Sequence, residues 1–115
     1  MNSTNSAVSV VSNRVDAFMS AQQLIRESNF GEALKILQNA CQEYGGNITL
    51  LCDTAVCEYY LGLIPSYRRT LARARHVLES HKELISRDRM LACKLMISKL
   101  LEEDGDVAEA FNICN

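Results

Sequence analysis

The chain has 115 residues, of which 48% are hydrophobic and 23% charged, with one proline and five glycines. It is therefore long enough for one globular domain and too apolar for a disordered chain. The formal net charge of −2 argues against a general nucleic-acid-binding protein. Because leucine, alanine, isoleucine, valine and methionine supply most of the apolar surface, the composition favours helices over sheets.

The chain contains five cysteines without Cys-x-x-Cys spacing. An odd number, at positions that suit a small apolar residue, indicates reduced core thiols in a cytoplasmic protein. The apolar stretch of residues 7–11 is short and interrupted by Ser9, so no signal peptide is predicted, and no run of apolar residues is long enough to span a membrane. We therefore expect a cytoplasmic protein.

The first three helices are predicted from the spacing of apolar residues. Residues 1–12 are small and polar and are expected to form a flexible leader to a helical domain over residues 13–115. A helix from residue 13 is interrupted at Ser28-Asn29, and a second runs from Phe30 to Gly45-Gly46-Asn47. A third, over residues 48–61, is apolar nearly all round, and we expect it at the buried centre of the domain.

Three further helices are predicted after Gly62, which ends the third. Pro65 suits the first turn of a helix over residues 66–80, and a fifth helix is expected over residues 86–103. Gly105-Asp106 then turns the chain into a sixth over residues 107–114, which has no polar cap. Either this helix is short and completes the fold, or the sequence is the front of a longer protein, which we expect because repeat arrays usually end in a solvating cap helix.

One segment of the chain occurs twice. Residues 28–34 (Ser-Asn-Phe-Gly-Glu-Ala-Leu) recur in altered form as residues 104–111 (Asp-Gly-Asp-Val-Ala-Glu-Ala-Phe) when Ala33 is aligned with Ala110. The shared pattern predicts a tight helix–turn–helix in which the alanine lets two antiparallel helices approach closely. An internal repeat of this kind favours a binding function over catalysis.

These helical pairs resemble the tetratricopeptide repeat (TPR), a unit of about 34 residues, in units of about residues 14–47, 48–81 and 86–115. A shift of 34 residues relates the first unit to the second, and a shift of 43 residues relates the second unit to the third. The resemblance implies an all-α fold, a right-handed stack of about three antiparallel helix pairs, or TPR-like α-solenoid. The residues at the family's packing positions are Leu24, Ala33, Leu37 and Ala40, then Ala55, Glu58, Gly62, Tyr67, Leu71 and Ala74, and then Leu101, Gly105, Ala110 and Cys114.

Proteins of this family bind a peptide or a helix in a concave groove lined by the first helix of each unit. The set that clamps a chaperone's terminal carboxylate is not matched, since Phe18, Asp53 and Met96 fall at three of its positions. The resemblance therefore implies a mostly apolar groove for a protein or peptide partner. Its lining would be Phe18, Gln22, Ile25, Arg26, Cys52, Val56, Tyr59, Tyr60, Leu95 and Lys99.

The charge is concentrated in the middle of the chain. Residues 66–89 carry seven bases and three acids, whereas the stretches on either side are acidic. Arg69, Arg73 and His76 share one helix face, and Arg68 and Arg75 flank it. This basic face either docks an acidic partner, a phosphate backbone or the acidic end of another copy, or is an ordinary solvated face. Nucleic-acid binding is not favoured, because no aromatic stacking platform accompanies the arginines.

Catalysis has no support in the sequence. His76 and His81 lie on different helix faces, and no histidine, cysteine or carboxylate pattern has metal-ligand spacing. The acidic residues 102–109 lack the alternating ligands of a calcium loop and are typical of a solvated helix end. We therefore expect neither an enzyme nor a metal or cofactor site.

The function favoured by the sequence is that of a non-catalytic protein–protein interaction or scaffold module. Three alternatives remain open. The chain could be a self-associating assembly domain of a larger complex, in which case acidic and basic surfaces would meet between copies. It could also be the regulatory domain of a multidomain regulator, or a chaperone for secreted proteins.

Overall fold

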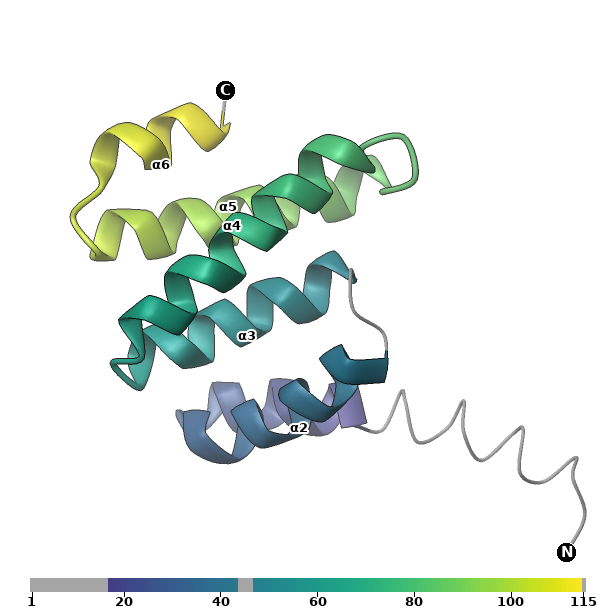
Figure 1. Ribbon diagram of the computed structural model, residues 1–115, viewed down its shortest axis with the longest axis vertical. Coiled ribbons are helices and arrows are strands. Elements are labelled where there is room, and N and C mark those ends of the chain that lie inside the picture. The colour runs from purple at the N-terminus through teal and green to yellow at the C-terminus, as the bar shows by residue number, and fades with distance from the viewer. Residues whose placement is uncertain (1–16, 44–46, 115) are drawn as a thin grey trace, which may run out of the picture.

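The computed structural model describes residues 17–43 and 47–114, and every regular element in these ranges is a helix. The all-α class is therefore confirmed, whereas the expected leader of residues 1–12 and the Gly45-Gly46 stop lie outside the described residues. A first helix is described over residues 17–26. It is followed by α2 (Phe30–Glu43), α3 (Ile48–Tyr60), α4 (Ile64–Ser80), α5 (Arg87–Glu103) and α6 (Val107–Cys114). In Figure 1, α2 lies towards one end of the helical body, α3 in the middle and α6 at the opposite end.

Helices α3 and α5 begin where a side chain supplies a hydrogen-bond acceptor for their first amides. The Asn47 side chain accepts from the backbone N–H of Thr49 at 3.0 Å and of Leu50 at 3.2 Å, which caps α3. Ser86 caps α5 in the same way. Helix α4 begins at Ile64, two residues before its predicted start, because Pro65 fits the first helical turn without losing a hydrogen bond.

Three of the turns between helices share one backbone geometry. Each contains a residue with positive φ: Ser28 (62°), Gly62 (77°) and Gly105 (88°), which lie 34 and then 43 residues apart. At each turn the N–H of that residue donates to the carbonyl three residues back at 3.0 Å, and the next N–H donates to the carbonyl five residues back at 2.8–2.9 Å. This is the Schellman pattern, and it satisfies the last carbonyls of each preceding helix.

The positive φ at these turns gives a testable difference between serine and glycine. Ser28 has the side chain that this conformation disfavours, so Ser28→Gly is expected to raise the free energy of unfolding by up to about 1 kcal/mol. Gly105→Ala is expected to lower it by about 1 kcal/mol or more, although a Cβ there would meet no atom within 4 Å. Urea unfolding of both variants measures the two changes, and changes of the same sign would contradict this explanation.

Helix α3 lies at the centre of the core, as predicted from its apolar sequence. Nine of its thirteen residues are buried. On one side Leu51 packs in a cluster with Leu71 of α4 and Ile97 of α5, and on the other Leu50 packs in a cluster with Leu37 of α2. The apolar contacts of the first hairpin and of the later helices therefore meet on α3.

The described cysteines are free thiols. Cys52, Cys57 and Cys93 are buried, whereas Cys41 is half-buried. A hydrogen bond with Cys93, together with burial, raises the pKa of the Cys52 thiol, and burial raises the pKa of Cys57 to about 12. The raised pKa keeps these two thiols protonated at neutral pH, and the predicted core position is confirmed for Cys52, Cys57 and Cys93.

Candidate interaction surface

Tyr60 is the most accessible aromatic side chain among the predicted groove residues, and two neighbours hold it in place. Its ring stacks on Phe30 of α2, with ring centroids 4.9 Å apart and an interplanar angle of 22°. Its hydroxyl donates a 2.6 Å hydrogen bond to Glu103 Oε2 at the end of α5. The residue nevertheless remains 47% exposed. Tyr60 therefore presents an ordered aromatic surface to solvent and joins three helices.

The neighbouring tyrosines are progressively more buried. Tyr59 packs edge-on against Tyr60, with centroids 5.4 Å apart, and lies 5.1 Å from the ring of Tyr67. Tyr67 is almost completely buried, and its hydroxyl has no hydrogen-bond partner in the described part of the chain. The hydrogen bond to Glu103 raises the pKa of Tyr60 to about 12, and burial raises the pKa of Tyr67 to about 12. Both hydroxyls are therefore protonated at neutral pH, and the Tyr60 hydroxyl is the one that donates a hydrogen bond among the described residues.

The exposed edge around Tyr60 is apolar with an acidic rim. Leu61 and Leu63 in the following turn are both exposed, which adds aliphatic surface beside the ring. Glu103 and Asp104, at the end of α5, place carboxylates at the same edge. We call Tyr60, Leu61, Leu63, Glu103 and Asp104 the tyrosine surface. Its composition suits an apolar segment that also carries a positive charge.

The predicted groove residues of the first helix differ in their exposure. Phe18, Gln22 and Ile25 are half-buried, and the two apolar residues pack against the cluster that contains Leu37. Arg26 is exposed, and its guanidinium donates to Gln23 at 2.9 Å. These side chains therefore contribute mainly to packing, and only Arg26 is fully available to a partner.

One predicted groove residue is placed differently: Cys52 is 0% exposed and lies in the core. Helix α5 covers the side of α3 that was expected to be open, and Cys93 of α5 contacts Cys52 there. The prediction that Cys52 lines a groove is therefore wrong. Val56, one turn further along α3, is half-buried and packs against the same cluster.

The two predicted groove residues of α5, Leu95 and Lys99, are both exposed and lie four residues apart on one side of that helix. Lys99 lies one turn before Glu103 and so stands near the tyrosine surface. Leu95 is on the side of α5 opposite the core residues Cys93 and Ile97, next to Leu91. Along this side of α5, Lys99 is therefore one turn and Leu95 two turns from Glu103, the hydrogen-bond partner of Tyr60.

Two carboxylates in α3 are buried: Glu58, which the resemblance places at a packing position, and Asp53, which falls at a position of the carboxylate clamp that the chain does not match. Asp53 is 4% exposed, and its Oδ2 has no hydrogen-bond partner among the described residues; Glu58 Oε1 is in the same situation. Burial raises the pKa of Asp53 to about 6, although the side chain of Gln22 acts in the opposite direction. The burial of both carboxylates could have been predicted from the sequence, because a charged residue in a helix that is apolar nearly all round must be buried.

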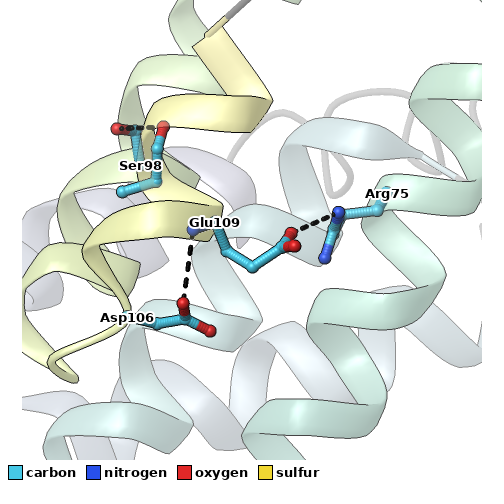
Figure 2. A network of polar contacts seen from close by, with 5 residues as sticks. Arg75, Ser98, Asp106 and Glu109 are labelled. Carbon is cyan, nitrogen blue, oxygen red and sulfur yellow. Dashed lines mark hydrogen bonds and ion pairs between the residues drawn. The ribbon is translucent and has the colours of Figure 1, made fainter.

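All five residues of the predicted basic face are exposed, but they do not form one patch of free charge. Arg69 donates to Ser66 at 3.2 Å, and His76 lies 3.3 Å from Ser80, so these side chains bond along their own helix. Arg75 instead forms a 2.7 Å ion pair with Glu109 of α6, as Figure 2 shows. The basic helix and the acidic end of the chain therefore meet within one molecule.

A cleft of about 310 Å³ lies beside this ion pair, between α4 and the turn from α5 to α6. The buried Tyr67 contributes to its wall. The cleft contains both signs of charge, so it has no clear preference for an anion or a cation. Its lining residues are Tyr67, Arg68, Leu71, Ala72, Arg75, Leu101, Asp104 and Asp106.

The part of the chain that the structure describes shows neither a metal-binding cluster nor a membrane-spanning helix. Among the described residues no group of three or more histidine, cysteine or carboxylate side chains is arranged to hold a metal ion. None of the helices in these ranges combines the length and the apolar character needed to cross a bilayer.

A comparison with protein-family models found no matching family, and comparisons with curated proteins and with solved structures found no match.

Proposed function

We propose that this chain is a non-catalytic, TPR-like interaction module that binds an apolar peptide or helix of a partner protein at the tyrosine surface. The observation that supports this proposal most strongly is Tyr60, which is half exposed but held by Phe30 and Glu103. An exposed tyrosine that is already ordered loses little conformational entropy when a partner packs on it. It offers a large contact area and a polar group, which are the properties of a binding hot spot.

The partner should carry a basic residue next to its apolar positions. Leu61 and Leu63 supply aliphatic area beside the Tyr60 ring, and Glu103 and Asp104 supply negative charge at the edge. The exposed Arg26 lies on the first helix, and the exposed Lys99 lies on α5, one turn before Glu103. Complementary charges at the rim of an interface mainly orient the partner, while the apolar centre supplies affinity.

Peptide selection tests this proposal without a known partner. Peptides of random sequence displayed on phage are selected on the folded protein, and the affinity of the best binders is measured by calorimetry. We expect Tyr60→Ala to weaken their binding by at least about tenfold, because truncating an aromatic hot spot typically has an effect of this size. Selected peptides should combine apolar residues with lysine or arginine.

Arg73→Ala is the matched control, because Arg73 is exposed on the outward face of α4 and contributes nothing to the tyrosine surface. Its binding should equal that of the unaltered protein. If binding falls with Arg73→Ala and is unchanged with Tyr60→Ala, the partner binds at the basic face and the proposal is wrong.

A further inference from the structure

The cleft between α4 and the turn from α5 to α6 has the size of a small-ligand pocket. Its volume is about 310 Å³, and pockets for small molecules typically measure about 300–1,000 Å³. Leu71 of α4 and Leu101 of α5, which are both buried, give it an apolar wall. We call this cavity the α4 cleft. Its volume suits one small molecule.

Tyr67 contributes a buried hydroxyl to the wall of the α4 cleft. The residue is 1% exposed, and its hydroxyl has no hydrogen-bond partner among the described residues. Burial raises the pKa of Tyr67 to about 12; the charges of Asp104 and Asp106 add to this rise and that of Arg68 opposes it. Because these three charged residues all line the cleft, the hydroxyl faces the cleft. It is therefore a protonated donor for which this part of the chain supplies no acceptor.

Charges of opposite sign lie on the two sides of the α4 cleft. Arg68 belongs to α4 and is exposed, and no ion pair joins it to Asp104 or Asp106 in the described part of the chain. Asp104 directly follows α5 and Asp106 directly precedes α6, so both carboxylates belong to the turn. A molecule with one cationic and one anionic group is complementary to both sides, whereas a simple ion is repelled by one of them.

A polar network connects the two sides of the α4 cleft through Glu109. The carboxylate of Glu109 forms the 2.7 Å ion pair with Arg75, and its backbone N–H donates to Oδ1 of Asp106 at 3.2 Å (Figure 2). The side chain of Arg75 is still 43% exposed, which leaves guanidinium N–H groups for a ligand. Arg75 and Asp106 are therefore held in place before a ligand binds, which lowers the entropic cost of binding.

We propose that the α4 cleft binds a free α-amino acid with an apolar side chain. The carboxylate of the ligand accepts hydrogen bonds from the Tyr67 hydroxyl and from the guanidinium of Arg68, which is the next residue in the chain. The ammonium group of the ligand donates to Asp104 and Asp106, and its side chain packs on the apolar wall. This site goes beyond the proposed peptide binding and shares only Asp104 with the tyrosine surface.

An NMR titration of the labelled protein with L-leucine at up to about 10 mM tests the site. Shifts of backbone amides should be concentrated in residues 67–75 and 101–106. N-acetylleucine lacks the positive charge and leucinamide lacks the negative charge, so each should bind at least about tenfold more weakly than leucine. The proposal is wrong if leucine shifts none of these amides, or if either analogue binds as tightly as leucine.

Two variants test the assigned contacts. Tyr67→Phe removes only the hydroxyl, which makes no hydrogen bond within the described residues, so it should weaken leucine binding at least about tenfold without lowering the stability. Arg68→Gln should weaken leucine binding by a similar factor. Arg73→Gln is the matched control, because Arg73 is exposed on α4 and does not line the cleft. Urea unfolding checks that all three variants fold.

Unchanged leucine binding by Tyr67→Phe would overturn the proposal. Equal losses from Arg68→Gln and Arg73→Gln would also overturn it, because they would assign the effect to the overall charge of α4. None of the three substituted residues belongs to the tyrosine surface. Failure of the amino-acid site is therefore distinguishable from failure of the proposed peptide binding, which Tyr60→Ala tests.

Discussion

Asp53→Asn is expected to stabilise the protein at pH 8 and to leave its stability at pH 4 nearly unchanged. Burial raises the pKa of Asp53 from 3.8 to about 6. Since the folded state holds this proton more tightly than the unfolded state, the stability of the unaltered protein should fall as the pH rises through this range and level off above it. The total change is about 3 kcal/mol or less. Asparagine carries no charge, so the substitution should remove this fall in the free energy of unfolding with rising pH.

The measurement is the free energy of unfolding in urea at several pH values between 4 and 8, for the unaltered protein and for Asp53→Asn. Glu79→Gln is a suitable control, because Glu79 is exposed on α4 and its neutralisation should leave the pH dependence unchanged. Equal pH profiles for the unaltered protein and Asp53→Asn would show that Asp53 is not held in a desolvated site.

Leu51→Ala is expected to lower the free energy of unfolding by about 2–5 kcal/mol, the usual range for a leucine removed from a close-packed core. Leu51 is 2% exposed and lies on α3 in the cluster shared with α4 and α5. The cavity would lie at the centre of the cluster, where collapse of the surroundings is restricted by helices on several sides. A loss of this size is a large fraction of the stability of a small domain.

Leu84→Ala makes the same chemical change at an exposed leucine and should alter the stability by less than about 0.5 kcal/mol. Urea unfolding followed by circular dichroism compares the two variants. Similar losses from Leu51→Ala and Leu84→Ala would contradict the central position of α3.

The helix boundaries could be predicted closely because they depend on local chemistry. Gly62 and Gly105 adopt positive φ at the turns, and Pro65 lies in the first turn of α4. The burial of α3 was also predictable, because its apolar residues point in every direction. These features need only the residues of one helix and its flanking turns.

The candidate site was less predictable because it depends on helices that are distant in sequence. Periodicity shows which residues of α3 are apolar, but it does not show that α5 covers Cys52 while Tyr60 stays open. Likewise the pair of Arg75 and Glu109 joins residues 34 positions apart on α4 and α6. The sequence assigned both to charged surfaces, and only the packing of the hairpins brings them together.

The measurement that tests the proposed interaction surface most directly is an NMR titration of the labelled protein with a selected peptide. The largest changes in backbone amide shifts should occur at Tyr60 and residues 61–63, with further changes near Phe30 and Glu103. Changes concentrated on the outward face of α4, around Arg69 and Arg73, would contradict the proposal and assign binding to the basic face instead.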